Sequence, residues 1–344
     1  MSGTQAARAK TFYTDDEKRS RIGSTISEYM GFFDEKRGGG VEARKAQYST
    51  MINDYYDVVT DFYEHGWGPS FHFAARARGE SFDASLARAE HYLGLRLNLR
   101  PGMRVLDVGC GVGGPMRSIA RFSGAFIEGV NNNDYQLQKV RQHNEEAGLS
   151  QLCSAFKGDF MNLPVADELY DAAYEIEATC HAPDKTGAFR EVHRVLKPGA
   201  LFAGYEWCMT DAFDPADTAH QEIKREIEIG DSLPDIASIP ATIKALEAAG
   251  FEVLDSFDAL RSSDPETPWY LPLVGETSSL LGLRRGRLGR RIARRTIGAL
   301  EAVGIAPEGS KQVSAMLGRA AEALIAGGEA GIFTPGFFFL ARRR

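Results

Sequence analysis

The sequence predicts an α/β fold with a mostly parallel sheet and helices on both faces. Short apolar runs alternate with helix-like segments from about residue 101 to residue 256, which is typical of a parallel sheet. The first of these runs, Val105–Val108, ends at the glycine-dense turn Gly109–Gly114. Glycine allows sharp turns and close approach of a ligand to the backbone. Ligands of such sheets bind beyond the carboxyl ends of the strands, so this turn is the expected cofactor site.

The individual elements follow in order along the chain. Strands are expected at 105–108, 126–130, 154–157, 170–175 and 200–207, with helices between them at 115–122, 133–147 and 186–196. Polar or aromatic residues stand at the strand ends, and these are Asp107, Asn131, Asp159, Glu175 and Trp207. We therefore expect these five side chains to gather at one edge of the sheet.

Three regions are expected. Residues 1–40 are predicted to be a flexible arm with a short helix near 16–33. Residues 41–260 form the main domain, which begins with a stretch rich in aromatic residues, Tyr55–Phe73. Residues 261–344 form a smaller C-terminal α+β region with a helix at 313–325. Its final apolar strand, 331–340, should lie inside or beside the main sheet, because an unpaired apolar strand risks aggregation.

Composition narrows the possible functions. With 43% hydrophobic and 25% charged residues, the chain is typical of a soluble globular protein. A net charge of −7 argues against nucleic-acid binding. The four cysteines are scattered, so neither a metal site nor a disulfide framework is expected, and a cytoplasmic location fits. No secretory signal or membrane span is expected.

One basic stretch, Arg284–Arg295, contains seven arginines and no acid. It is either a peripheral contact with an anionic membrane surface or a solvated face that balances acids elsewhere.

The glycine turn fits two cofactor classes. Gly109, Gly111 and Gly114 have the spacing of a dinucleotide fingerprint, which also needs a carboxylate about 20 residues further on. Asparagines stand there instead, at 131–133. Asp107, two residues before Gly109, completes a pattern that resembles motif I of the class I S-adenosylmethionine-dependent methyltransferases, whose fold is Rossmann-like.

That resemblance implies a cofactor site. Asp107, Gly109, Gly111 and Gly113 would flank the methionine part, and Asn131 and Gln136 would lie near the ribose. Asp159 and Phe160 would meet the adenine, and Glu175 would place a charge close by.

Longer blocks narrow the resemblance. They are Tyr63–Gly68, Val108–Pro115, Asn131–Gln136, Glu175–Pro183, Tyr205–Asp211 and the tail Gly331–Pro335. Together they resemble the signature blocks of sterol 24-C-methyltransferases, over roughly residues 50–344. His65 and Glu175 depart from the family's usual tyrosine and alanine, and the composition, rich in arginine and alanine, suggests a bacterial member.

The resemblance implies methyl transfer from S-adenosylmethionine, which becomes S-adenosylhomocysteine, to C24 of a sterol side chain with a 24,25 double bond. The resulting carbocation, after a hydride shift, loses a proton from the added methyl. The sterol is the expected partner, and the resemblance suggests a homo-oligomer.

This chemistry needs a dry aromatic pocket and a weak base. The expected aromatic wall consists of Tyr63, Trp67, Phe71, Phe73, Tyr174, Tyr205 and Trp207. The candidate bases are Glu64, His72, Glu177, His181 and Glu206, of which Glu177 and His181 are favoured because they follow the fourth strand.

Two other functions stay open at this stage. The acceptor could be another polyprenyl-derived lipid or a tocopherol-like ring, or the chain could bind sterol without turnover. Transfer of labelled methyl to a panel of lipids separates these readings.

Overall fold

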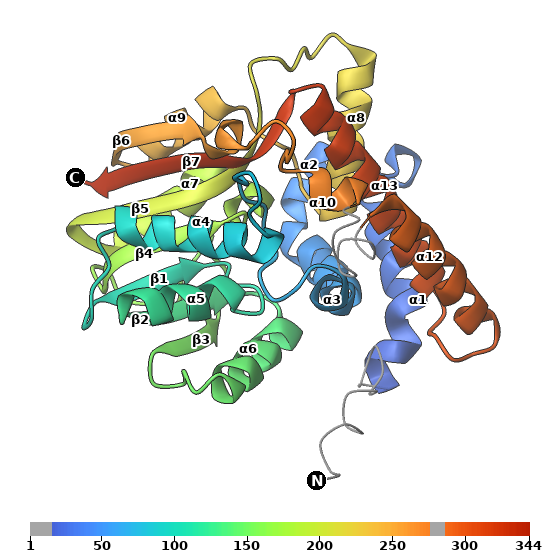
Figure 1. The fold of residues 1–344 in the computed structure, drawn as a ribbon, viewed down its shortest axis with the longest axis horizontal. Helices are drawn as coiled ribbons and strands as arrows, with labels where there is room; N and C mark the ends of the chain where they lie inside the picture. The colour runs from blue at the N-terminus through green and yellow to red at the C-terminus, as the bar shows by residue number, and fades with distance from the viewer. Residues whose placement is uncertain (1–15, 276–285) are drawn as a thin grey trace.

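The computed structural model describes residues 16–275 and 286–344. A seven-stranded sheet lies beside a group of helices drawn from both ends of the chain (Figure 1). The strands are β1 (Arg104–Val108), β2 (Phe126–Asn131), β3 (Cys153–Lys157), β4 (Tyr170–Ile176), β5 (Leu196–Met209), β6 (Phe251–Asp258) and β7 (Phe333–Arg343). Their order is β3-β2-β1-β4-β5-β7-β6, and only β7 runs antiparallel to its neighbours.

Helices pack on both faces of the sheet, as the sequence predicts. Helices α4 (Phe82–Arg96), α5 (Gly114–Ser123) and α6 (Asp134–Glu146) contribute to one core, and α7 (Lys185–Val195) and α9 (Ile239–Ala248) to the other. Neighbouring strand residues belong to opposite cores: Val105 packs with α5, and Leu106 with α7. Side chains alternate across a strand, so both faces of the sheet are buried and the strands are apolar throughout.

The remaining helices form a helical lobe beside the carboxyl ends of the parallel strands. They are α1 (Asp16–Gly31), α2 (Val41–Ala46), α3 (Tyr48–Gly66), α8 (Thr218–Asp231), α10 (Leu271–Val274), α12 (Arg287–Ala302) and α13 (Ser310–Glu329). Short 3-10 turns occur at Glu35–Arg37, Thr179–His181 and Ala259–Ser262. None of the helices in the described ranges has the length and apolar character needed to cross a membrane.

The region 1–40, expected to be a flexible arm with a short helix, contains a helix that is packed against the rest of the protein. Helix α1 is present near the predicted bounds, but Ile22, Ile26 and Tyr29 are buried against α3 and α13. Residues 16–33 are therefore packed into the helical lobe, because one face of α1 is apolar enough to bury. Residues 1–15 lie outside the described residues.

The C-terminal strand lies within the main sheet, as expected. Strand β7 inserts between β5 and β6, and the side chains of Phe337, Phe338 and Phe339 are buried in alternation on its two faces. The C-terminal region therefore completes the sheet and also supplies α12 and α13 to the helical lobe. Of the basic stretch, Arg284 and Arg285 lie outside the described residues, and 287–295 begin α12.

Candidate active site

Two adjoining cavities lie where the sheet meets the helical lobe. The first, the strand-end cavity, holds about 910 Å³ of empty space, part of it open to solvent, and is lined by Asp107, Gly109, Gly111, Asn131, Gln136, Asp159 and Phe160 among others. The second, the helix-walled cavity, holds about 1290 Å³ and is lined by α3, the loop after it, and helices α12 and α13. Both cavities are lined by Tyr56, Phe71, His72, Glu177 and His181. These five residues form the shared wall.

The glycine turn after β1 needs its glycines for different reasons. Gly109 has a φ of +79°, and a Cβ there would lie 2.5 Å from the Cβ of Ala178. Gly111 has a φ of +52°, but a Cβ would meet nothing within 4 Å, because this backbone faces open space in the strand-end cavity. Gly114 has no room for a side chain, since a Cβ would lie 2.0 Å from the carbonyl oxygen of Pro69. Gly113 caps the start of α5 and is not among the lining residues.

Asp107 presents a buried carboxylate to the strand-end cavity. Its Oδ2 accepts a hydrogen bond of 2.8 Å from the hydroxyl of Tyr174, while Oδ1 has no hydrogen-bond partner within the described ranges. Burial raises the pKa of Asp107 to about 7, and the Tyr174 hydrogen bond opposes this rise. A ligand ammonium group would restore the charged form, so the site fits the amino-acid end of a cofactor. Tyr174, expected in the substrate wall, instead orients this carboxylate.

The polar residues at the end of β2 are largely satisfied by one another. The side-chain amide of Asn131 donates to the Gly111 carbonyl at 3.0 Å and to Gln136 Oε1 at 2.9 Å, and Gln136 donates to Thr60 at 3.2 Å. These contacts fix the glycine turn against α6. Both residues line the cavity as expected, but both amide hydrogens of Asn131 and one of the two of Gln136 already have acceptors in the protein.

The end of β3 brings Asp159 and Phe160 into the strand-end cavity. Asp159 accepts hydrogen bonds from the Tyr48 hydroxyl and, at 2.8 Å, from the Met161 amide. Each carboxylate oxygen has a second lone pair, so the carboxylate can still accept from a ligand amine. Tyr48, at the start of α3, belongs to this cavity and was not expected from the sequence.

Glu177 is the central group of the shared wall. One carboxylate oxygen accepts from the Phe73 amide at 2.7 Å, and the other accepts from the Trp207 indole N–H at 2.7 Å. Burial raises the pKa of Glu177 to about 8, although the nearby His72 and these two donors oppose the rise. Its φ is +55°, a strained conformation for a residue with a Cβ, and such strain concentrates at functional sites.

His72 carries positive charge beside Glu177. Its Nδ1 lies 2.9 Å from the Phe73 carbonyl oxygen, which only accepts, and its Nε2 lies 3.1 Å from a carboxylate oxygen of Glu90. Both ring nitrogens therefore face acceptors, which favours the imidazolium. Burial lowers the pKa of His72, but the hydrogen bond and charge of Glu90 outweigh burial, and the net direction is upward.

His181 is neutral, as its hydrogen-bond partners and its lowered pKa indicate. Its Nδ1 donates to the Ser232 carbonyl at 2.9 Å, which leaves Nε2 to accept from the Tyr56 hydroxyl at 3.0 Å. Burial lowers the pKa of His181 to about 4. Its basic nitrogen is thus already occupied by Tyr56.

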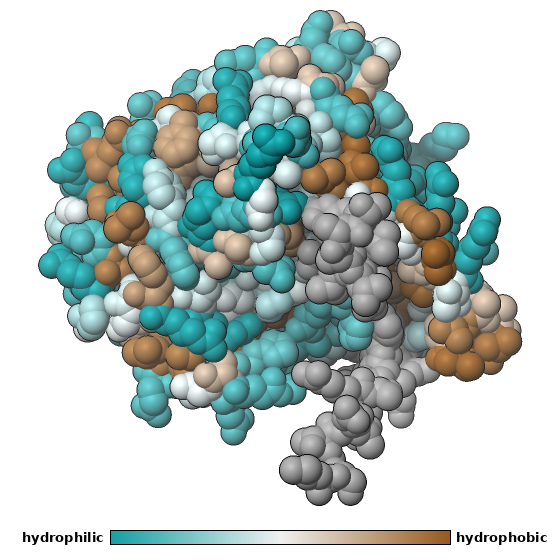
Figure 2. Space-filling view, viewed as in Figure 1, coloured by the Kyte–Doolittle hydropathy of each residue, from teal (hydrophilic) through white to brown (hydrophobic). Residues whose placement is uncertain are grey.

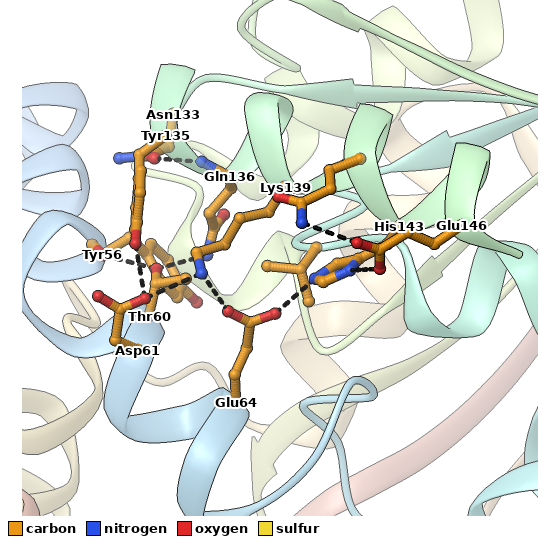
Figure 3. A network of polar contacts seen from close by, with 12 residues as sticks. Tyr56, Thr60, Asp61, Glu64, Asn133, Tyr135, Gln136, Lys139, His143 and Glu146 are labelled. Carbon is orange, nitrogen blue, oxygen red and sulfur yellow. Dashed lines mark hydrogen bonds and ion pairs between the residues drawn. The ribbon is translucent and has the colours of Figure 1, made fainter. Parts of the chain in front are cut away.

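Glu64, an expected base, lines neither cavity and is instead part of a network of polar contacts with α6 (Figure 3). Its carboxylate contacts Lys139 at 2.5 Å and His143 at 2.7 Å, so it joins α3 to α6. Burial raises its pKa, but hydrogen bonds from these two partners outweigh burial, and the pKa is lowered. Tyr63 faces the cavity and Glu64 does not, because neighbouring residues of a helix point about 100° apart around its axis.

Three further expected site residues are absent from the lining of both cavities. Glu206 is fully buried and accepts from Lys185 at 2.8 Å and from the Thr179 hydroxyl. Glu175 is fully buried, accepts from the Ala178 amide at 3.0 Å, and has a pKa raised by burial and by the charge of Glu206. Tyr205 donates to the Ala89 carbonyl at 3.1 Å within the core of the sheet. Glu175 and Glu206 accept hydrogen bonds from Ala178 and Thr179 and so brace the turn that follows Glu177.

The aromatic wall of the helix-walled cavity otherwise agrees with expectation. Tyr63, Trp67, Phe71, Phe73 and Trp207 all line it. Tyr55 and Tyr56 also line this cavity, in agreement with the interpretation of the aromatic stretch 55–73 as one wall of a substrate pocket, whereas Asp231 and the opposite wall of apolar residues from α10, α12 and α13 were not expected. The tyrosines lie in a stretch whose aromatic density was a usable signal, whereas nothing local distinguishes Asp231 from other acids of its helix.

Comparison with known proteins agrees with this geometry. Residues 106–204 match the family described as methyltransferase domain, and residues 280–343 match the family described as sterol methyltransferase C-terminal. The chain is 50% identical to cycloartenol-C-24-methyltransferase 1 of Oryza sativa subsp. japonica, over 96% of this chain and 94% of the relative. It is 45% identical to the sterol 24-C-methyltransferase of Saccharomyces cerevisiae, over 92% and 85% of the two chains. These plant and yeast relatives do not support the expected bacterial source.

The fold also has solved counterparts. The cyclopropane synthase MmaA2 of Mycobacterium tuberculosis superposes with a TM-score of 0.65 at 16% identity, over 84% of this chain and 96% of that one. The cofactor is S-adenosylmethionine, and the strand-end cavity fits it through the Asp107 carboxylate and the open backbone of Gly111. On the strength of the full-length relatives, the chain belongs to the sterol 24-C-methyltransferase family.

Proposed function

We propose that this enzyme transfers a methyl group from S-adenosylmethionine to C24 of a sterol with a 24,25 double bond, with cycloartenol the first acceptor to test. One observation carries the proposal: a large apolar cavity adjoins the cofactor cavity, and Glu177 belongs to the wall of both. The names of the plant relatives, at 50% and 52% identity, support cycloartenol as the first choice.

When bound, the cofactor supplies a methyl group on a positively charged sulfur. Asp107 would hold its amino group, and Asp159 and Phe160 would hold its adenine. An alkene has no proton to remove before attack, so the enzyme's task is to align the reactants and exclude water. Near-attack alignment can contribute about 7–11 kcal/mol.

The shared wall is suited to positive charge. Both oxygens of Glu177 accept from groups that only donate, which matches the carboxylate form once a cation is near. Trp67, Phe71 and Trp207 line the acceptor side, and a cation–π contact with an aromatic ring in a dry pocket adds on the order of 2 kcal/mol. We infer that Glu177 balances the charge that passes from the cofactor to the sterol side chain.

The test uses the purified enzyme with methyl-labelled cofactor. Cycloartenol, lanosterol, zymosterol and desmosterol are offered side by side with a tocopherol precursor. We expect label in a 24-methylated or 24-methylene sterol, identified by mass spectrometry. Label in the ring compound alone, or in none of the lipids, would contradict the proposal.

We further propose that α12 contacts an anionic membrane surface. Leu288, Ile292 and Val303 are 64%, 57% and 68% exposed, and apolar side chains gather along this helix and its following turn (Figure 2). Arg291, Arg294 and Arg295 make no ion pair with any residue that the structure describes. An exposed apolar stripe flanked by unpaired arginines is typical of a helix that lies in a membrane interface.

The position of α12 links this surface to the substrate. Arg290, Ala293 and Ile297, on another face of the same helix, line the helix-walled cavity. A lipid acceptor would therefore enter next to the membrane. We expect flotation with vesicles that contain phosphatidylserine and not with neutral vesicles, and loss of flotation in the triple variant Arg291→Ala, Arg294→Ala, Arg295→Ala. Equal binding to both vesicle types would contradict this contact.

A further inference from the structure

Asp231 is a buried carboxylate in the helix-walled cavity that the proposed chemistry has not yet used. It is the last residue of α8, and its charge is felt by Glu177 and by three tyrosines of the cavity. Its Oδ1 lies 3.3 Å from the Tyr63 hydroxyl. Its Oδ2 is closed off from solvent and has no hydrogen-bond partner among the residues that the structure describes.

The end of α8 is an unfavourable place for a negative charge. Helix C-termini carry partial negative charge from unpaired carbonyl groups. Two of these carbonyls are capped by tyrosines, Ile229 by Tyr29 and Gly230 by Tyr55. The Gly230 carbonyl cannot obtain a helical partner, because the residue four positions later is Pro234, which has no N–H. Tyr55 is therefore committed as a donor to Gly230, at 2.7 Å.

Because Tyr55 donates to Gly230, the donor and the acceptor of the next hydrogen bond, between Tyr55 and Tyr63, are also fixed. Tyr55 also contacts the Tyr63 hydroxyl, and each phenol has one proton. Since the proton of Tyr55 goes to Gly230, Tyr63 must donate to Tyr55. No phenol proton then remains for the contact between Tyr63 and Asp231. Three contacts need three protons, and the two tyrosines supply only two.

Protonation of Asp231 supplies the third proton that these three contacts need. The acid form donates from Oδ1 to Tyr63, Tyr63 donates to Tyr55, and Tyr55 donates to Gly230, so that every contact has its own proton. With Asp231 ionised, Tyr63 must share one proton between Tyr55 and Asp231. The chain from Asp231 to Gly230 is thus built to take up one proton.

We propose that Asp231, reached through the Tyr63 hydroxyl, accepts the proton that the sterol cation loses, an inference that rests on the proposed function. A C–H bond of the transferred methyl breaks, and its electron pair forms the new carbon–carbon double bond and cancels the cation. The proton goes to the Tyr63 oxygen, and the Tyr63 proton moves to Asp231 Oδ1. The cation and the carboxylate are both neutralised, so charge and atoms balance.

The other candidate bases are less suited to this step. The Nε2 of His181 already faces the Tyr56 hydroxyl, and each oxygen of Glu177 already accepts one hydrogen bond, whereas Asp231 Oδ2 has no partner among the described residues. Tyr63 lines the helix-walled cavity directly, whereas the fifth candidate, Glu206, is sealed in the core. Asp231 is the acid whose hydrogen-bond network is completed rather than broken by a proton.

The first measurement needs no turnover. Infrared difference spectra between the wild type and Asp231→Asn should show a carboxylate band at high pH that gives way to the carbonyl band of a protonated carboxylic acid as the pH falls, since Asn gives neither band. Asp235→Asn is the matched control, because Asp235 follows four residues later and is ion-paired with Lys224 at 2.6 Å. If Asp231→Asn keeps every carboxylic-acid band that Asp235→Asn shows, the proton accounting is contradicted.

The second measurement follows the reaction with a deuterated methyl donor. In Asp231→Asn we expect turnover to fall at least 100-fold, a larger isotope effect on product formation, and some sterol alcohol from capture of the cation by water. Tyr63→Phe should give the same signature, and Asp231→Glu should restore part of the rate, as a merely structural role would not. Wild-type rate and products in Asp231→Asn would overturn the proposal. Absence of methyl transfer in the wild type would instead contradict the proposed function, and the infrared spectra would still report the protonation of Asp231.

Discussion

The two cavities differ in how the chain builds them. Most of the strand-end cavity comes from residues 107–160, where each contributing side chain follows a strand of the sheet. The helix-walled cavity draws on residues 55–73, the end of α8, and helices α10, α12 and α13 from the far end of the chain. The methyl-donor site is therefore encoded locally, whereas the acceptor site depends on segments that meet only in the folded protein.

The two cavities also differ in how their polar groups are paired. Asn131 donates to Gln136 beside the cofactor turn, and Asp107 keeps a carboxylate oxygen that has no hydrogen-bond partner in the described ranges. Beside the helix-walled cavity, Tyr55 donates a hydrogen bond to a carbonyl at the end of α8, and Asp231 Oδ2 has no hydrogen-bond partner in the described ranges. The strand-end cavity is preorganised to bind the methyl donor, whereas the helix-walled cavity has a carboxylate that can still accept a proton.

The largest effect should come from Asp107→Asn, which acts on the donor side only. Asn keeps the shape but cannot pair with an ammonium group, so we expect the affinity for S-adenosylhomocysteine to fall about 100-fold, or roughly 2.7 kcal/mol. Calorimetry measures this directly, with Asp134→Asn, an exposed acid, as the control. Sterol binding should be unchanged. Unchanged cofactor affinity would show that Asp107 has only a structural role.

The next largest effect should come from Ala321→Trp, which acts on the acceptor side only. Ala321 is buried on α13 and lines the helix-walled cavity, so the indole would occupy sterol space. We expect sterol affinity to fall at least about tenfold, at an overpacking cost of about 1–3 kcal/mol in stability. The same replacement at the exposed Ala302 is the control. Calorimetry with S-adenosylhomocysteine should detect no change. A parallel loss of cofactor affinity would mean that the two cavities are not independent.

The same contrast explains what the sequence could predict. The sheet, its flanking helices and the insertion of the last strand follow from periodicity and from the risk of an unpaired apolar edge. Asp107, Gly109, Gly111, Asp159 and Phe160 line the strand-end cavity, because carboxyl ends of parallel strands meet at one edge, and their contact with the cofactor stays a prediction.

Prediction failed where the direction of one side chain, set by its exact place on a helix or by the irregular pairing of β5 after Glu206, decides whether it reaches a cavity. Glu64 and Tyr63 are neighbours, yet only Tyr63 faces the cavity. Tyr205 and Glu206 are buried in strand β5, while Trp207, at the next position, reaches the cavity. Asp231 was missed because its role depends on α3 and on Pro234, and no local pattern reports such a meeting.

A smaller effect is expected in the pH dependence of folding. The pKa of Glu177 is raised from 4.5 to about 8, so the folded protein holds this proton where the unfolded chain releases it. The stabilising contribution is full below about pH 4.5 and is lost as pH rises through 8. In urea titrations without cofactor, Glu177→Gln should therefore flatten the decline in stability between these pH values.

Glu191→Gln is the control for this titration. Hydrogen bonding to Arg194 lowers the pKa of Glu191, so its contribution is present at neutral pH and is lost as pH falls. The two substitutions should change the pH profile in opposite senses. Identical profiles for Glu177→Gln and the wild type would contradict the shifted pKa at the shared wall.

The smallest effect is expected from Glu64→Gln, which tests whether an acid from the aromatic stretch belongs to the chemistry. Glu64 pairs with Lys139 and His143 at a partly buried contact between α3 and α6, so its loss should cost about 1 kcal/mol of stability. Urea denaturation measures this cost, and Glu145→Gln, an exposed acid of α6, should cost less. Turnover should stay at the wild-type value in both variants, because Glu64 lines neither cavity. A loss of turnover in Glu64→Gln that Glu145→Gln does not show would mean that Glu64 takes part in the reaction at the helix-walled cavity.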